Sequence, residues 1–281
     1  MPKELFRIDQ LDIPHATAKQ RVADNWRAVV DDVARSAQRH GRQPDSIRIV
    51  GVTKYVDEVI TSWLVESGCH DLGENRPQVL MQKWQAFQNE TSWPIESTRS
   101  ICWHQIGHLQ RNKVKKLLDA SPTIHSIDSM RLLEEIIHQA NQSAPIGLSS
   151  ERDEDSEPTE PSISVLVEVN VSGEAAKTGL PPEQLDGLLE RFQITHSIGQ
   201  TQSNCSVALV GLMAMAGWGT DAAEAQRQFD RLRSIRDDAT RKRGITLPEL
   251  SMGMSGDFDA AIAAGSTMVR IGSRLFEGLI R

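Results

Sequence analysis

Residues 249–273, ELSMGMSGDFDAAIAAGSTMVRIGS, are the stretch that decides the fold. Both ends of this stretch, 249–254 and 267–271, are short and mostly apolar, and they have the length that is typical of buried strands. The middle, 257–264, carries alanine and isoleucine in a pattern that suits a short helix. A strand, a helix and a second strand in this order predict a βαβ unit, in which the two strands run parallel.

The same alternation continues through the rest of the chain. The expected strands are 47–53, 70–74, 101–107, 123–128, 163–171, 207–215, 249–254 and 267–271. Between them we expect helices at 57–67, 77–89, 109–119, 129–141, 182–193, 221–243 and 257–264. Eight strands in 281 residues predict an α/β fold of the (β/α)8 TIM barrel type. A doubly wound sheet has the same alternation, so the pattern alone leaves that alternative open.

The sequence also predicts an N-terminal extension to the barrel and two polar insertions within it. We expect residues 1–44 to form a tail and an extra N-terminal packing helix over 15–41, and residues 45–281 to form a single barrel. Residues 141–162 combine acids, serines and prolines, and they predict a disordered acidic insertion in the barrel. Residues 196–206, HSIGQTQSNCS, predict a shorter polar loop before the sixth strand.

Composition excludes several classes of function. A net charge of -7 argues against a nucleic-acid partner, because such proteins must neutralise phosphates. The chain has no apolar run of membrane-spanning length, and its first residues lack the apolar core of a signal peptide. Three widely spaced cysteines suit a reducing compartment. We therefore expect a cytoplasmic protein with no membrane contact.

Small and polar residues follow the seventh and eighth strands. In TIM barrels the chemistry gathers at the carboxyl ends of the strands, and phosphate binds after strands seven and eight. Ser255 and Gly256 follow one of these strands, and Gly272 and Ser273 follow the other. Glycine lets the backbone approach an anion, and the N–H groups at the start of a helix attract it. One such turn is more typical of a simple helix cap, whereas two on adjacent strands suit a phosphate site as well as they suit two helix caps.

Lys54 follows the first strand, at the same end of the barrel. A lysine in a partly desolvated pocket can attack a carbonyl and form a Schiff base. Opposite a phosphate site, such a lysine suits a phosphorylated aldehyde, of which pyridoxal 5′-phosphate (PLP) is the common one. On the strand alone, a surface lysine at a strand end is the more typical interpretation.

Arg270 lies two residues before Gly272, so both face the same side of the strand. If that side is the lumen of the barrel, Arg270 lies where the pyridine nitrogen of PLP would be and disfavours protonation of that nitrogen. Considered by itself, this arginine more typically pairs with a carboxylate in the barrel core.

The histidines do not form a metal motif. His104 and His108 are four residues apart and Cys102 is close by, but the turn at Gly107 separates the two rings. Because no carboxylate cluster completes a ligand set, we expect no metal site.

Several long motifs, in order, resemble the pyridoxal phosphate homeostasis protein family. The segments are GVTKY (51–55), LGENRPQ (72–78), WHQIGHLQRNKVKKL (103–117), IHSIDSMRL (124–132), VLVEVNVSGEAAKTGL (165–180), LVGLMAM (209–215) and LSMGMSGDFDAAIAAGSTMVRIGS (250–273). The resemblance runs from about residue 45 to 276. Thr53, Tyr55 and Gln105 depart from the family's usual residues, as does Glu277 near the end of the chain.

The resemblance implies a barrel of PLP fold type III, like the N-terminal domain of alanine racemase. It implies a cytoplasmic PLP carrier in vitamin B6 and amino-acid homeostasis, with no turnover of its own and therefore no catalytic residue. The residues that it assigns to PLP are Lys54 as the Schiff-base lysine, Asn75 beside the ring, Met213 as a wall, Arg270 at the pyridine nitrogen, and Ser255, Gly256, Gly272 and Ser273 at the phosphate. The partners we expect are PLP, free amino acids and PLP-dependent apo-enzymes, with the chain itself a monomer.

A fold type III enzyme of the racemase kind is the alternative. Racemisation needs a base on each face of the substrate carbanion, and alanine racemases use the lysine and a tyrosine. This chain has one tyrosine, Tyr55, directly after Lys54. If strand alternation continues to these residues, the two side chains point to opposite sides. The sequence therefore favours the carrier.

Overall fold

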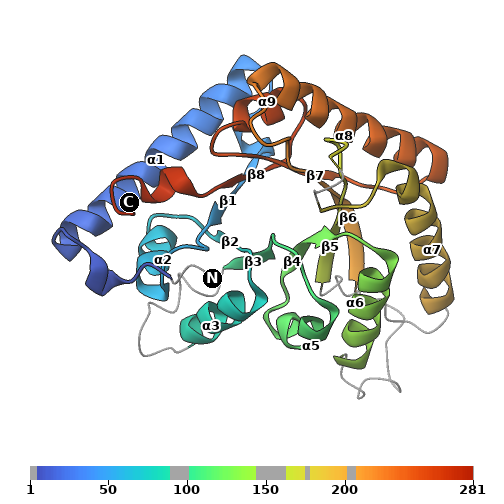
Figure 1. Cartoon of the computed structure of the whole chain (residues 1–281), viewed down its shortest axis with the longest axis horizontal. Coiled ribbons are helices and arrows are strands. Elements are labelled where there is room, and N and C mark those ends of the chain that lie inside the picture. Colours follow the sequence, from blue (N-terminus) through green and yellow to red (C-terminus); the bar gives the residue numbers. More distant parts are fainter. Residues whose placement is uncertain (1–4, 89–100, 144–162, 175–177, 201–206, 281) are drawn as a thin grey trace, which may run out of the picture.

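The computed structural model of the chain describes residues 5–88, 101–143, 163–174, 178–200 and 207–280, and its eight strands form a closed parallel barrel. The strands are β1 (Arg48–Val52), β2 (Asp71–Glu74), β3 (Cys102–Gln105), β4 (Thr123–Ile127), β5 (Ile163–Glu168), β6 (Val207–Met213), β7 (Glu249–Met254) and β8 (Met268–Ile271). Each strand pairs with the next along the chain, and β8 closes the ring on β1. Figure 1 shows the helices outside this ring. The predicted TIM barrel is confirmed, and the doubly wound alternative is wrong.

Helices connect the strands on the outside of the barrel. They are α1 (His15–Arg39), α2 (Glu58–Glu66), α3 (Pro77–Phe87), α5 (Val114–Leu117), α6 (Met130–Ser143), α7 (Pro182–Gln200), α8 (Ala222–Arg243) and α9 (Phe258–Ala263). Their ends follow local chemistry. Asp221 begins α8 by accepting a hydrogen bond from the Glu224 N–H at 2.8 Å, and Gly244 ends it in the left-handed conformation, with φ at 63°.

Helix α1 covers the seam where the barrel closes. The 3-10 helix η5 (Ser273–Phe276) follows β8, and α1 packs against η5, α9 and α2 (Figure 1). Its buried face has helical spacing and includes Val22, Val29 and Val33. Asn25 on the same helix donates hydrogen bonds to the carbonyls of Leu275 and Glu277 at 3.2 and 3.1 Å. The expected N-terminal helix therefore takes the place of a helix after β8.

The hydrophobic core lies mostly between the strands and the helices. Its fully buried members include Leu72 and Ile124 from the strands, and Leu64, Leu133 and Phe229 from the helices. Alternation along a strand sends every second side chain to this layer and the others into the lumen. The lumen holds polar groups as well, because His125 on β4 and Ser251 on β7 form a hydrogen bond of 2.8 Å between strands that are not neighbours in the ring.

Three expectations from the sequence are wrong in detail. Residues 196–200, predicted as loop, extend α7 to Gln200; the stretch contains no proline, the residue that costs most inside a helix. The predicted helix at 109–119 is a short α5 between two 3-10 turns, since Val114, Leu117 and Ala120 are buried at a spacing of three residues. β3, β5 and β6 end two or three residues before their predicted ends.

The acidic insertion falls largely outside the description. Helix α6 continues to Ser143, and residues 144–162 lie outside the described residues, as do 201–206 of the predicted polar loop. Of the helices in the described ranges, none combines the length and the apolar character that crossing a membrane requires.

Candidate functional site

Lys54 lies in a tight turn directly after β1, and the residue before it is held from three sides. The Thr53 N–H donates to the Gly73 carbonyl at 3.0 Å, and the Thr53 hydroxyl donates to Glu74 Oε1 at 2.7 Å. The ammonium of Lys83, from α3, donates to the Thr53 carbonyl at 2.8 Å. Thr53 is fully buried, whereas Lys54 is half-buried. The lysine thus projects from a fixed base at the mouth of the barrel.

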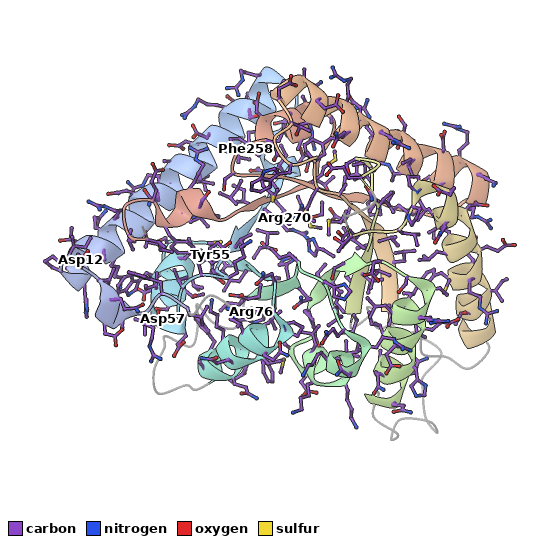
Figure 2. All side chains as sticks on the ribbon, viewed as in Figure 1. Asp12, Tyr55, Asp57, Arg76, Phe258 and Arg270 are labelled. Carbon is purple, nitrogen blue, oxygen red and sulfur yellow. The ribbon has the colours of Figure 1, made fainter. Side chains whose placement is uncertain are left out.

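Tyr55 does not point away from Lys54, and the expectation that it would is wrong. Strand β1 ends at Val52, so the alternation of side chains stops before these residues. In the turn, Lys54 Nζ lies 4.9 Å from the centroid of the Tyr55 ring, a cation–π distance. The Tyr55 carbonyl also accepts the Phe6 N–H at 2.7 Å, so the N-terminal segment braces the turn. Figure 2 labels Tyr55 beside the strands, between Arg270 and the Asp57 that begins α2.

Asn75 follows β2, the neighbour of β1 in the barrel. Its Oδ1 atom is buried and has no hydrogen-bond partner in the part of the chain that the structure describes. Its carbonyl accepts a hydrogen bond from Gln105 Nε2 at 3.3 Å. Gly107 passes so close that a Cβ atom there would lie 2.4 Å from the Asn75 carbonyl oxygen, so only glycine fits. Asn75 is therefore tightly placed, with one acceptor left for a ligand.

The small residues after β7 and β8 come together. Ser255 Oγ accepts a hydrogen bond from the Gly272 N–H at 3.2 Å, which joins the two strand ends. A Cβ added to Gly256 would meet nothing within 4 Å, so the space beside that residue is open. Ser273 is exposed and begins η5. These residues form a cradle with hydroxyl and N–H groups at the mouth, next to the strand that carries Lys54.

Arg270 lies in the lumen, and Figure 2 places its label in the middle of the ring of strands. Its Nη1 atom donates to the Ser251 carbonyl at 2.8 Å and to the Ser251 hydroxyl at 2.6 Å, and its Nη2 atom donates to the Ala214 carbonyl at 3.0 Å. These partners are neutral, so the alternative of a direct carboxylate pair is not what holds it. Burial lowers the pKa of Arg270 to about 10, and it still carries its charge at neutral pH.

Two carboxyl groups act on Arg270 from a distance. Glu168 at the end of β5 is almost fully buried, and Asp257 follows β7. Burial raises the pKa of both carboxyl groups, while the charge of Arg270 lowers it. The hydroxyl of Thr178 also stabilises the charged form of Glu168, donating to it at 2.7 Å. Neither of these two carboxyl groups is among the site residues predicted from the sequence.

The structure joins some of the predicted site residues and leaves others apart. Ser255 contacts Gly272, and Met213, fully buried, immediately precedes the Ala214 whose carbonyl binds Arg270. For Lys54 the contact that defines its place is with Tyr55. Four of the predicted residues lie on or directly after successive neighbours in the barrel: Ser255 after β7, Arg270 on β8, Lys54 after β1 and Asn75 after β2.

The two histidines near β3 have different partners. His104 bonds to Asp71 and His125, whereas His108 Nδ1 lies 3.0 Å from Asp128 Oδ2 at the mouth. Within the described ranges, no group of three histidine, cysteine or acidic residues could hold a metal ion.

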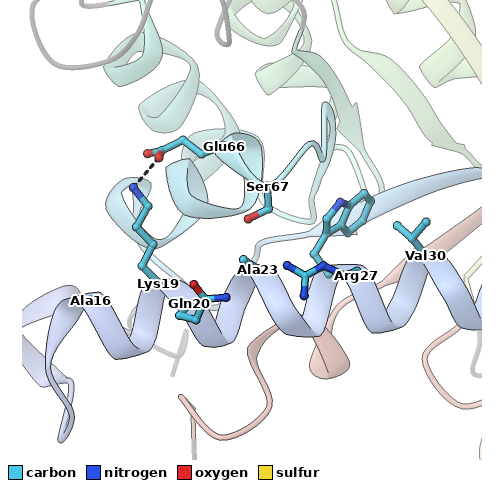
Figure 3. A pocket seen from close by; sticks show the side chains of 9 residues that line it. Ala16, Lys19, Gln20, Ala23, Arg27, Val30, Glu66 and Ser67 are labelled. Atoms are coloured by element: carbon cyan, nitrogen blue, oxygen red, sulfur yellow. Dashed lines mark hydrogen bonds and ion pairs between the residues drawn. The ribbon is translucent and has the colours of Figure 1, made fainter.

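A separate groove of about 580 Å³ lies on the outer surface between α1 and α2 (Figure 3). Trp26 and Val30 contribute apolar area to it, and an ion pair between Lys19 and Glu66 at 2.5 Å spans the two helices. None of the predicted site residues lines this groove, so it belongs to the packing of α1 rather than to the mouth of the barrel.

Two lumen residues that bear on Arg270, His125 and Ser251, were not predicted. The available signal was a polar residue inside an otherwise apolar strand: His125 in TIHSI and Ser251 in ELSMGM. That signal does not say which strands meet, because the two residues are 126 positions apart.

Comparison with known proteins gives a consistent result. The family described as "Alanine racemase, N-terminal domain" matches residues 95–279. A pyridoxal phosphate homeostasis protein from Aquifex aeolicus is 32% identical over 88% of this chain and 94% of its own length. One from Bos taurus is 36% identical over 89% of this chain and 84% of its own length.

A solved structure matches over a similar extent. PipY of Synechococcus elongatus PCC7942, solved with PLP bound, has a TM-score of 0.66 and 28% identity, and the match covers 87% of this chain and 99% of PipY. Barrel, strand-end residues and relatives agree, and the chain belongs to the pyridoxal phosphate homeostasis protein family.

Proposed function

We propose that this protein binds PLP at the mouth of the barrel and carries it, linked to Lys54, without turnover of its own. The proposal is supported by relatives that are named for PLP homeostasis and by PipY, whose structure contains PLP. The residues at the mouth offer a group for each part of that cofactor.

The chemistry of the donors fits PLP. In the cradle of Ser255, Gly256, Gly272 and Ser273, the Gly272 N–H binds Ser255 Oγ, and the two serine hydroxyls and the Gly256 N–H are donors of the kind that phosphate prefers. The buried Oδ1 of Asn75 has no donor among the described residues, and the phenolic hydroxyl of PLP could donate to it. Met213, which is fully buried and directly precedes the Ala214 whose carbonyl binds Arg270, supplies an apolar wall.

Lys54 would hold the cofactor covalently. Its amine attacks the aldehyde carbon, a C=N bond forms, and one water molecule leaves. Because Lys54 is half-buried and not enclosed, that bond stays accessible to free amino acids, which can exchange with the lysine.

Arg270 is the observation that carries the proposal. A charged guanidinium, 4% exposed, sits in the lumen one strand from Lys54, held by neutral partners. Beside a pyridine nitrogen it disfavours protonation of that nitrogen, so the ring withdraws electrons poorly. A site built in this way binds PLP firmly and activates a bound amino acid weakly, which is what a carrier needs.

The absorption spectrum of the purified protein tests this proposal. We expect a visible band that borohydride removes, and we expect Lys54→Ala to abolish it while the barrel stays folded. Lys115→Ala, which changes an exposed lysine on α5, is the matched control and should keep the band. A reducible adduct in Lys54→Ala would show that another lysine is the anchor.

One observation favours the alternative, a racemase-like enzyme. Lys54 and Tyr55 contact each other and so approach a substrate from one side, but Glu168 lies on β5, across the ring from β1. Burial raises the pKa of the Glu168 carboxyl group, and raised carboxyl pKa values are common among general acids and bases. Glu168 is thus a candidate base for the opposite face.

Chiral chromatography of L-alanine incubated with the PLP-loaded protein separates carrier from enzyme. We expect only trace racemisation. Turnover near 1 per second, typical of enzymes, that is lost in Glu168→Gln would establish the enzyme instead.

A further inference from the structure

A row of polar side chains crosses the lumen of the barrel and ends at Arg270. We call it the lumen chain; its members, in order, are Asp71 (β2), His104 (β3), His125 (β4), Ser251 (β7) and Arg270 (β8). The successive contacts measure 2.9 Å, 2.9 Å, 2.8 Å and 2.6 Å. The two histidines and the serine are fully buried. Four unbroken bonds on five strands therefore link one carboxylate to one guanidinium.

The two ends of the lumen chain fix the direction of its hydrogen bonds. A guanidinium only donates and a carboxylate only accepts. Arg270 donates to the Ser251 hydroxyl, so the hydroxyl proton is free to go to His125 Nδ1. His125 then donates from Nε2 to His104 Nδ1, and His104 donates from Nε2 to Asp71. Both rings are neutral in this arrangement, with the proton on Nε2.

The reversed arrangement is worse. It would place two protons on His104 and one on Nδ1 of His125. Both His125 and Arg270 would then donate to Ser251, and the hydroxyl proton would have no acceptor among the described residues. Burial, with His104 and Arg270 nearby, also lowers the pKa of His125 well below its usual value, which keeps this ring neutral.

The lumen chain does not serve as a proton wire. A wire needs an end group that gives up its proton at working pH, and an arginine retains its proton there. What the chain can do is orient. Hydrogen bonds in series polarise one another, so the negative end at Asp71 strengthens the grip of Ser251 on the guanidinium.

This arrangement leaves one part of Arg270 free. Ser251 and the Ala214 carbonyl take three of its five N–H groups, and the described residues supply no partner for the other two. A carboxylate in direct contact would engage the guanidinium at two nitrogens and fix it away from a ligand. A neutral hydroxyl at the end of a polarised chain holds the cation and keeps donors available.

We propose that the lumen chain positions Arg270, with Asp71, His104, His125 and Ser251 as positioning residues that present its guanidinium to the ring nitrogen of the cofactor. The part that concerns the cofactor rests on the proposed function; the orientation of Arg270 does not.

Nitrogen NMR of histidine-labelled and arginine-labelled protein without PLP tests the orientation. We expect His104 and His125 to be neutral with the proton on Nε2, and we expect slow rotation to give Arg270 separate Nη signals. In Ser251→Ala the bonds of Arg270 to the carbonyls of residues 251 and 214 remain, but the bond from Nη1 to the hydroxyl is lost, so the Nη1 signal should shift and the Nη signals should exchange faster. A proton on Nδ1 of His125, or unchanged Arg270 signals in Ser251→Ala, would overturn the proposal.

Ser266→Ala is the matched control. Ser266 is equally buried and binds carbonyls of the same two strands, at Met252 and Met268, but it lies outside the lumen chain. We expect it to leave the histidine and Arg270 signals unchanged. If Ser251→Ala does not fold, Ser251→Thr keeps the hydroxyl and should retain the native signals, and the tautomers of the unaltered protein still decide the direction of the chain.

PLP binding tests the role of the chain in the site. Loss of a hydrogen bond to a charged group should raise the dissociation constant of PLP about tenfold in Ser251→Ala and change the pH at which the visible band titrates, with neither effect in Ser266→Ala. Equal behaviour of the two variants would refute the positioning role. Absence of a visible band in the unaltered protein would reject the proposed function, while the NMR result still decides the orientation of Arg270.

Discussion

Two buried polar assemblies support the mouth of this barrel, and they are built differently. The lumen chain lies inside the ring of strands and separates its charges, Asp71 and Arg270, by three neutral groups. The other, the wall pair, lies between β2 and α3 and consists of Glu74 and Lys83 in direct contact at 2.5 Å, both without solvent exposure.

The difference between them concerns what each holds. In the lumen chain every link is a hydrogen bond whose donor and acceptor are fixed by the two charged ends. In the wall pair, Glu74 Oε1 receives Lys83 and the Thr53 hydroxyl, while Glu74 Oε2 has no partner among the described residues. The wall pair fixes the backbone beneath Lys54, and the lumen chain fixes a side chain. A direct ion pair is suited to fixing the backbone, and a series of neutral hydrogen-bonding groups is suited to orienting the Arg270 side chain.

The largest effect we expect comes from breaking the wall pair. Lys83→Met leaves Glu74 charged and buried without its counter-ion, and such a change costs about 3–5 kcal/mol. Urea unfolding measures the loss. The double variant Glu74→Gln with Lys83→Met should recover much of it, because no charge stays buried. A loss below about 1 kcal/mol in the single variant would mean that the pair does not act as a unit.

An intermediate effect should appear when the pH is lowered. Burial holds the pKa of His125 in the folded protein well below its value of 6.5 in the unfolded chain. The unfolded chain therefore binds more protons below that pH, and the stability that His125 contributes, complete above pH 6.5, is lost as the pH falls. One such group gives a slope of about 1.4 kcal/mol per pH unit.

Denaturant unfolding between pH 7.5 and pH 5 measures this slope, with His125→Asn for comparison. In the variant, the slope of the unfolding free energy against pH should be smaller by the contribution of about one proton. Identical slopes in both proteins would show that the lumen tolerates a charged His125 and would weaken the contrast with the wall pair. Glu168 and Asp257, whose raised pKa values act in the opposite direction, are common to both proteins and cancel in the comparison.

The smallest effect sets the scale for an ordinary polar contact. Asp57 is the N-cap of α2, where Oδ1 accepts the Ile60 N–H at 2.9 Å and Oδ2 accepts the Ile8 N–H at 2.8 Å. Asp57→Ala should cost about 1–2 kcal/mol in thermal or urea unfolding. Asp57→Asn keeps one acceptor and should cost less. A loss as large as that of Lys83→Met would place this cap in the same class as the wall pair.

The sequence predicts the barrel well because its information is local. Runs such as RIVGV and ISVLVE are apolar and rich in β-branched residues, and each became a strand near its expected place. The prediction for Tyr55 was wrong because it assumed that β1 reaches Lys54, and the end of a strand is set by partners elsewhere. The roles that the resemblance assigns to the eight site residues stay predictions, whereas the cradle formed by Ser255 and Gly272 follows from two neighbouring strands.

The lumen chain and the wall pair could not be predicted, for a physical reason. The members of the lumen chain come from five strands spread along the sequence, and a single polar residue in an apolar run does not reveal its partner. The wall pair joins residues only nine positions apart, but the sequence does not show that the Lys83 side chain turns inward onto Glu74. His125 in isolation is typical of a buried histidine of any kind. It is barrel closure that brings His125 to Ser251 and gives both a role.

The placement of α1 has a consequence for synthesis on the ribosome. This helix is made before all eight strands, yet Asn25 binds the Leu275 carbonyl 250 residues later, and Arg21 binds the Gly278 carbonyl 257 residues later. Contacts with such separation form slowly. Helix α2 can cover part of α1 early, but the part of α1 that packs against α9 and η5 must stay exposed, or be shielded by a chaperone, until β8 has emerged from the ribosome. Newly made chains should resist proteases only once synthesis has passed β8.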